Sequence, residues 1–136
     1  MADKKKELKK AYLQNHPPMG IYQIRNLANG KVFVGSSPNL PGALNSNKFQ
    51  LSAGSHRNKT LQREWSELGE DKFAFEILDE LSAIEGAGKD YRPDLVVLED
   101  FWLDKIKPYG DRGYNEKKKG TEERLKIIAQ NRLSNE

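Results

Sequence analysis

The sequence contains no cysteine and no long apolar run. The lack of cysteine excludes disulfide scaffolds, thiolate zinc sites and cysteine nucleophiles. A membrane-spanning helix needs roughly 20 consecutive apolar residues, and no segment of this chain approaches that length. The chain begins with charged residues where a signal peptide would carry an apolar stretch. We therefore expect a cytoplasmic protein that makes no contact with a membrane.

Hydrophobic residues make up 36% of the 136-residue chain and charged residues 32%. The apolar residues recur in periodic clusters, whereas disordered chains carry few of them and spread them thinly. A chain of this length has room for one domain of ordinary size. We expect a single small core.

The net charge of +3 conceals an unequal distribution of charge along the chain. Residues 1–60 contain ten basic and two acidic residues, whereas residues 61–136 contain 13 basic and 18 acidic residues. A basic half suits contact with a polyanion such as nucleic acid. Solvated faces of ordinary surface helices would give the same counts, so charge alone leaves both interpretations open.

Local patterns predict the element order β-β-α-α-β-α with a helical extension at each end. Two β-rich runs at 20–26 and 31–35 flank Asn29-Gly30 and predict a hairpin. The other predicted elements are helices at 41–53 and 58–68, a strand at 72–78 with Phe73, Phe75 and Ile77 on one face, a loop at 82–92, a helix from Pro93 to about Lys107, and a final amphipathic segment with Leu125, Ile128 and Ala129.

One carboxylate stands on the apolar face of the helix predicted after Pro93. At 100° per residue, with Leu95 at zero, Glu99 falls at about 40°, inside the arc of apolar residues. Burying an unpaired carboxylate is costly, so Glu99 needs a cation, a hydrogen-bond network or a metal ion. The alternatives are that Glu99 lies at the edge of a narrower stripe, or that it pairs with a lysine such as Lys31.

A series of short motifs runs from the predicted hairpin to the last turn. In chain order the motifs are Gly20-Ile21-Tyr22, Phe33-Val34-Gly35, Asn39-Leu40, Gly54-Ser55-His56, Leu61-Gln62-Arg63, Glu99-Asp100-Phe101-Trp102 and Gly113-Tyr114-Asn115. This ordered series resembles the GIY-YIG nuclease domain, a family that includes homing endonucleases. The resemblance covers about residues 19–116. It leaves residues 1–18 as a basic helical arm and residues 117–136 as a helical tail.

The resemblance implies an α/β (α+β) fold, in which helices flank a small three-stranded antiparallel sheet. It also implies a DNA endonuclease that hydrolyses phosphodiester bonds with one Mg²⁺ or Mn²⁺ held by Glu99. Tyr22 would help to deprotonate the attacking water, while His56 and Asn115 would line the site. Each of these three residues also has an ordinary interpretation, as a core aromatic, a surface or capping histidine, and a turn residue.

Two positions depart from the family pattern. Phe33 stands where the family has a tyrosine, and Ala43 stands where it has an arginine. A preorganised cation near developing charge contributes on the order of 3–4 kcal/mol to the transition state, and alanine supplies none of it. Either activity is much reduced, or another basic residue has taken over the role. The residues expected to bind nucleic acid are Lys31, Lys48, Arg57 and Lys59.

These observations support two functional hypotheses. The leading one is a weakened, metal-dependent DNA endonuclease. The alternative is a catalytically degenerate module on the same fold that binds nucleic acid or a protein. The 136 residues show no separate DNA-recognition module, so the chain either acts alone with low specificity or needs a partner protein that supplies specificity.

Overall fold

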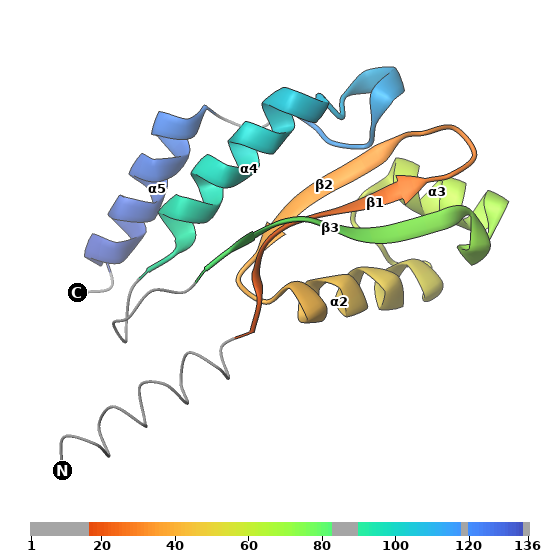
Figure 1. The fold of residues 1–136 in the computed structure, drawn as a ribbon, viewed down its shortest axis with the longest axis horizontal. Helices are drawn as coiled ribbons and strands as arrows, with labels where there is room; N and C mark the ends of the chain where they lie inside the picture. The colour runs from red at the N-terminus through yellow and green to blue at the C-terminus, as the bar shows by residue number, and fades with distance from the viewer. Residues whose placement is uncertain (1–16, 83–89, 118–119, 135–136) are drawn as a thin grey trace, which may run out of the picture.

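The computed structural model describes residues 17–82, 90–117 and 120–134 (Figure 1). The predicted basic arm, up to residue 16, and most of the loop predicted at 82–92 lie outside these ranges. The described elements are β1 (Met19–Asn26), β2 (Val32–Ser37), α2 (Leu40–Ser52), α3 (Lys59–Leu68), β3 (Phe73–Leu81), α4 (Arg92–Ile106) and α5 (Thr121–Ser134), with short 3-10 turns at Glu70–Lys72 and Gly110–Arg112. The chain order agrees with the order predicted from local patterns.

The three strands form one antiparallel sheet in the order β2-β1-β3, which confirms the predicted sheet. The hairpin of β1 and β2 turns through Gly30, whose positive φ of 80° favours glycine. β3 continues to Leu81, beyond the predicted end at residue 78. Tyr22 pairs with Ile77 and Ile21 pairs with Asp79, so a bulge leaves one extra residue on β3.

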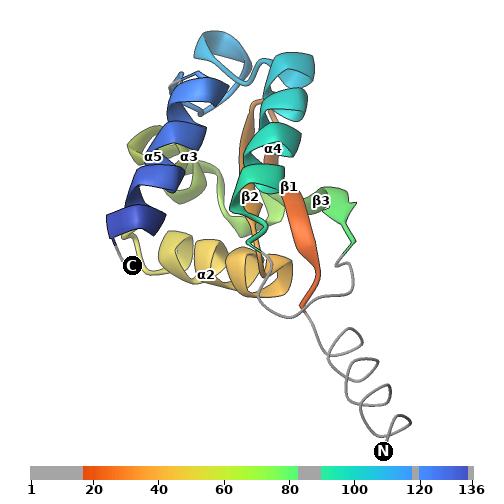
Figure 2. The same ribbon diagram turned by 90° about the vertical axis from the view of Figure 1, so that its left-hand side faces the viewer.

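Helices cover both faces of the sheet, and alternate strand residues pack against them (Figures 1 and 2). Tyr22, Ile24 and Phe33 point toward α2 and α3, while Ile21, Val32 and Val34 point toward α4. On the first face Trp65 of α3 packs against Phe73 and Phe75, two of the three residues predicted to share one face of β3. The third, Ile77, is 46% exposed on this edge strand.

Helix boundaries follow their capping residues. The Asn58 side chain accepts a hydrogen bond from the backbone of Leu61 at the start of α3, and Gly69 ends that helix with φ 91°. Pro93 stands in the first turn of α4, and Lys107 ends α4 in the left-handed conformation. The final predicted segment is helical as α5, which lies against α4 in both views (Figures 1 and 2).

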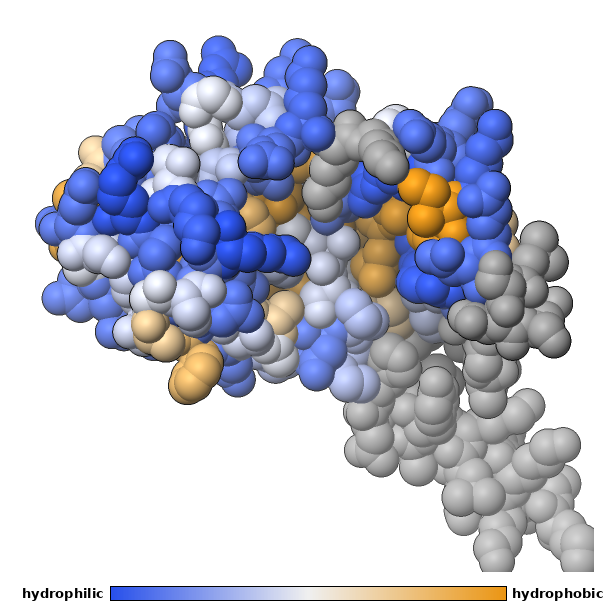
Figure 3. All heavy atoms as spheres, turned by 180° about the vertical axis from the view of Figure 1, so that it is seen from behind, coloured by the Kyte–Doolittle hydropathy of each residue, from blue (hydrophilic) through white to orange (hydrophobic). Residues whose placement is uncertain are grey.

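The surface of the described residues is largely polar. Figure 3 shows a mostly hydrophilic face with apolar side chains gathered in limited areas. Among the described helices, none combines the length and apolar character that a membrane crossing requires.

Candidate active site

An open cavity of about 640 Å³ lies beside the edge of β2, where four separate segments meet. Its lining residues come from the hairpin, the start of α3, the middle of α4 and the segment after the second 3-10 turn: Tyr22, Phe33, Val34, Gly35, Ser36, Arg57, Asn58, Lys59, Thr60, Glu99, Tyr114, Asn115, Glu116 and Lys117. Five residues predicted for the site, namely Tyr22, Arg57, Lys59, Glu99 and Asn115, are therefore together on its wall.

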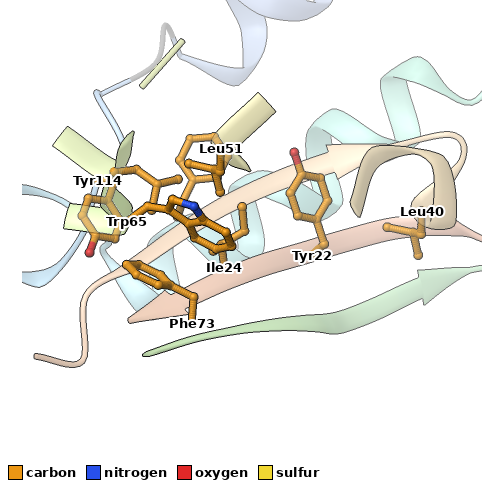
Figure 4. Packing of buried hydrophobic residues seen from close by; sticks show 9 residues of the cluster. Tyr22, Ile24, Leu40, Leu51, Trp65, Phe73 and Tyr114 are labelled. Atoms are coloured by element: carbon orange, nitrogen blue, oxygen red, sulfur yellow. The ribbon is translucent and has the colours of Figure 1, made fainter. Parts of the chain in front are cut away.

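The Tyr22 side chain reaches the cavity by extending over Gly35, its neighbour on β2. It pairs with Gly35 across the hairpin, and a Cβ atom built at Gly35 would lie only 2.5 Å from the Tyr22 hydroxyl oxygen. A glycine is required there because any side chain would displace the phenol ring. The ring extends away from β1 between Ile24 and Leu40 (Figure 4), and only 4% of Tyr22 is exposed.

Asn47, a buried residue of α2, fixes the Tyr22 hydroxyl. Its Nδ2 donates to the Tyr22 Oη at 3.2 Å and to the backbone carbonyl of Ala43 at 2.8 Å. Its Oδ1 faces the Nε2 of His56 at 2.7 Å. Because the Tyr22 oxygen accepts from Asn47, the phenol proton remains available to a group in the cavity. Burial raises the pKa of Tyr22, and the nearby Arg57 charge opposes that rise.

His56 belongs to this network and is fully buried behind the cavity wall. Its Nδ1 accepts the backbone N–H of Asn58 at 3.0 Å, so its Nε2 carries the proton that faces Asn47. Its ring packs edge-on against Phe33 at 5.8 Å. Burial, and secondly the charge of Arg57, hold the pKa of His56 below its usual value. A neutral histidine with both nitrogens engaged supports Tyr22 through Asn47.

Glu99 is 1% exposed, as its place on the apolar arc of α4 predicts, and it borders the cavity. One partner is Arg124 of α5, whose Nη2 lies 2.8 Å from the Glu99 Oε1. The alternative pairing with Lys31 is wrong: the Lys31 ammonium lies 3.7 Å from Glu64 and over the ring of Tyr114. Residue spacing could not indicate Arg124, because that contact depends on how α5 packs against α4.

Asn115 holds the last segment of the cavity wall against the sheet. Its side-chain amide donates to the Val34 carbonyl and accepts the Val34 N–H, both at 2.8 Å. The neighbouring Tyr114 N–H donates to the Val32 carbonyl at 2.9 Å. Asn115 thus fixes the edge of β2 that faces Glu99.

Most of the chain that forms this cavity is similar to known proteins. Residues 18–115 match the GIY-YIG catalytic domain. The chain belongs to the GIY-YIG family. Intron-associated endonuclease 1 of Enterobacteria phage T4 is 33% identical over 88 residues, which are 64% of this chain and 32% of that endonuclease. The chain therefore matches less than two thirds of that relative's length.

Two solved structures of GIY-YIG domains share the fold. The catalytic domain of the homing endonuclease I-TevI is 30% identical with a TM-score of 0.61, and the match covers 74% of this chain and 99% of that domain. A mutant of the same catalytic domain gives 30% identity and a TM-score of 0.59 over 72% of this chain and 92% of that chain. The family match ends at residue 115, so α5 and Arg124 lie beyond it.

The two departures from the GIY-YIG pattern have distinct surroundings. Phe33 packs in the core cluster beside His56, and its side chain brings no hydroxyl to the cavity. Ala43 is partly buried against the same cluster. Lys48, one of the residues expected to bind nucleic acid, lies on α2 with its ammonium 3.3 Å from Glu70, and it does not line the cavity. Arg57 and Lys59 do line it.

GIY-YIG nucleases generally depend on a divalent metal, and the Glu99 carboxylate has the chemistry to hold one. Among the described residues, no three acidic, histidine or cysteine side chains gather closely enough to hold a metal ion. Glu99 supplies the hard carboxylate oxygen that Mg²⁺ and Mn²⁺ prefer, on the wall of an open cavity. Mg²⁺ commonly keeps several waters and one or two protein carboxylates, so a single glutamate is a chemically reasonable ligand set.

Proposed function

We propose that this domain hydrolyses phosphodiester bonds in DNA with one divalent cation, Mg²⁺ or Mn²⁺, at a rate lowered by the loss of the family arginine. The observation that carries the proposal is that Tyr22 and Glu99, from opposite layers of the fold, border one cavity that Arg57 and Lys59 also line. Such an activity on DNA fits a cytoplasmic location.

Tyr22 would act on the attacking water. Asn47 donates to its Oη, so the phenol oxygen keeps a fixed position while its own proton points elsewhere. Because burial raises the Tyr22 pKa, the residue is a phenol at neutral pH and orients the water by hydrogen bonding. As pH rises, the growing phenolate fraction would accept the proton of the water.

The scissile phosphate would lie between the acidic and the basic walls of the cavity. Arg57 and Lys59 are exposed and line the cavity, so they can contact phosphate oxygens. Glu99 would hold the cation, which when bound supplies Lewis-acid stabilisation of the charge that develops on the phosphoryl oxygens. Ala43 offers no such charge, and this absence underlies the expected weak activity.

Nicking of supercoiled plasmid DNA with Mg²⁺ or Mn²⁺ tests the proposal. We expect nicking by the unmodified protein and a loss of at least about a hundredfold in Glu99→Gln, because the substituted side chain cannot hold the cation. Glu67→Gln is the matched control, since Glu67 forms only a surface ion pair with Arg63 at 4.0 Å. Equal nicking by all three proteins, or none by any, would remove the catalytic proposal.

The second candidate function is a binding module that has lost turnover. Phe33 and Ala43 favour it, because each removes a polar group that the family carries at the site. The double variant Phe33→Tyr, Ala43→Arg separates the candidates. A large gain of nicking indicates a weakened nuclease, whereas unchanged DNA binding without nicking indicates a module with a different role.

Sequence specificity would come from a partner protein or from protein segments outside this domain. The matched relative is about three times longer than the region that aligns with it, since that region is 32% of its length. A domain of this size that contacts DNA mainly through Arg57 and Lys59 reads phosphates, which carry no sequence information.

A further inference from the structure

Arg124 connects the candidate cation site to a helix outside the family domain. The match to the family ends at residue 115, and Arg124 lies in α5, at Thr121–Ser134. Its guanidinium bridges two neighbouring carboxylates of α4, with Nη2 2.8 Å from Glu99 and Nη1 2.6 Å from Asp100. The Thr121 hydroxyl also donates to Asp100, which fixes the start of α5 on the same carboxylate.

The contact is shielded from water. The Arg124 side chain is 16% exposed and that of Glu99 is 1% exposed. Charges held in this way interact more strongly than a surface ion pair, because little solvent separates or screens them. Arg124 therefore supplies a shielded counter-charge to the buried Glu99 carboxylate.

The same contact opposes a cation. A divalent ion at the Glu99 carboxylate would lie within a few ångströms of the positive guanidinium already bound there, and the two like charges repel. A glutamate with an arginine on one oxygen is a poorer cation ligand than a glutamate without one.

We propose that Arg124 is a latch on the cation-binding carboxylate: α5 holds its guanidinium on Glu99, and a divalent cation gains Glu99 only in competition with this ion pair. This inference rests on the proposed function, because it takes Glu99 as the cation ligand. Cation binding at Glu99 would then depend on α5, a helix that lies outside the matched GIY-YIG domain.

Mn²⁺ binding by the full chain, without DNA, tests the latch. Free Mn²⁺ is measured by electron paramagnetic resonance during titration of the unmodified protein, Arg124→Met, and Arg124→Met combined with Glu99→Gln. We expect Arg124→Met to bind Mn²⁺ at least about tenfold more tightly, because a nearby positive charge has been removed. The added Glu99→Gln change should abolish that gain. Arg63→Met, which removes an exposed arginine of α3, is the matched control and should bind as the unmodified protein does.

The outcomes separate the latch from the proposed function. If the unmodified protein and Arg124→Met bind Mn²⁺ with equal affinity, and Glu99→Gln abolishes that binding, the latch is overturned and Glu99 remains the cation ligand. Weaker binding by Arg124→Met also overturns it, since Arg124 would then position Glu99 for the ion. Absence of Glu99-dependent binding in every variant overturns both proposals.

Thermal unfolding gives a second readout that needs no activity. In chelator, Arg124→Met should unfold at a lower temperature than the unmodified protein, because the buried Glu99 carboxylate loses its ion pair with Arg124. Mn²⁺ should raise the melting temperature of the variant more than that of the unmodified protein. If Arg124→Met folds only when Mn²⁺ is present, the latch is supported. If Mn²⁺ does not rescue it, and Arg124→Gln, which keeps a polar side chain without the charge, binds Mn²⁺ no more tightly than the unmodified protein, the latch is overturned.

Discussion

Asn47 holds the hydroxyl end of Tyr22 in place. It lies on the buried side of α2 and connects the Tyr22 hydroxyl with the His56 ring through one amide group. Substitution of Asn47 by alanine would remove the donor to the Tyr22 hydroxyl and the acceptor of the buried His56 N–H. A buried polar group without its partner costs about 1–3 kcal/mol.

We therefore predict that Asn47→Ala lowers the melting temperature and reduces plasmid nicking by at least about tenfold, as expected when a reacting group loses its orientation. Asn45→Ala, at an exposed position of the same helix, is the control and should change neither quantity. If the two variants nick plasmid DNA equally well, Tyr22 does not need the network.

His56 makes stability depend on pH. Its pKa is lowered in the folded state, so the unfolded chain takes up a proton at higher pH than the folded protein. The stabilisation is complete above the unfolded pKa of about 6.5, and it is lost as pH falls from there toward the folded value. The loss is at most about 1.4 kcal/mol per pH unit.

Denaturant unfolding at pH 7.5 and 5.5 checks this prediction. The free energy of unfolding should fall between these values in the unmodified protein and fall less in His56→Gln, whose side chain does not titrate. Parallel pH dependences in the two proteins would show that His56 is not the group responsible.

Sequence reasoning located the residues of the site that motifs mark and missed those that tertiary contacts bring in. Tyr22 and Glu99 were found because one lies in a motif and the other breaks an apolar pattern. Asn47 was missed, although it follows Leu40 and Leu44 and precedes Leu51 at helical spacing, which places a polar side chain on the buried face. The helical angles that place Glu99 among apolar residues place Asn47 among Leu40, Leu44 and Leu51 in the same way.

At the scale of elements, Asn58 joins the start of α3 to the segment that closes the cavity. Its Oδ1 accepts the backbone N–H of Leu61 at 3.0 Å, while its Nδ2 donates to the Tyr114 carbonyl at 2.7 Å. A helix cap that serves only its own helix contributes about 1 kcal/mol. Asn58 supports two elements through one side chain.

We predict that Asn58→Ala lowers the free energy of unfolding by more than an isolated cap does, by about 2 kcal/mol. Asn39→Ala is the comparison, because Asn39 caps α2 from an exposed position through a hydrogen bond from Gly42. Urea unfolding of both variants measures the difference. A larger loss in Asn39→Ala than in Asn58→Ala would contradict the second role.

The elements themselves were predictable because their signals are local. Asn29-Gly30 marks the hairpin, and Asn58 and Gly69 mark the ends of α3. The bulge in β3 and its extension to Leu81 depend on pairing with β1, where the paired residues lie 55 to 62 positions earlier, and no local pattern carries that information.

At the scale of the whole molecule, the basic and acidic halves of the sequence partly neutralise each other. Lys31 pairs with Glu64 and Lys48 pairs with Glu70, so two of the expected nucleic-acid contacts are held by acids of the other half. Arg57 and Lys59 lie on the cavity wall. The positive charge available to a phosphate in the cavity therefore comes from fewer residues than the ten basic residues of 1–60 suggest.

We predict that the double variant Arg57→Met, Lys59→Met binds DNA more weakly and that its affinity depends less steeply on salt. The magnitude of the slope of log affinity against log salt concentration should fall by up to about 2, because each phosphate that is no longer neutralised removes about 0.9 from it. Both changes are made in Glu99→Gln so that cleavage does not interfere. Lys48→Met in the same background is the control and should leave the slope unchanged. Equal slopes in all three proteins would locate the DNA-binding surface elsewhere.

The two hydrogen bonds between Asn115 and Val34 have a consequence for the sheet as a whole. β2 is an edge strand, and edge strands offer unpaired backbone groups to strands of other molecules. The Asn115 amide imitates a neighbouring peptide group and occupies both the N–H and the carbonyl of Val34. The Asn115 side chain, which shapes the cavity wall, therefore also prevents a strand of another molecule from pairing with β2 at Val34.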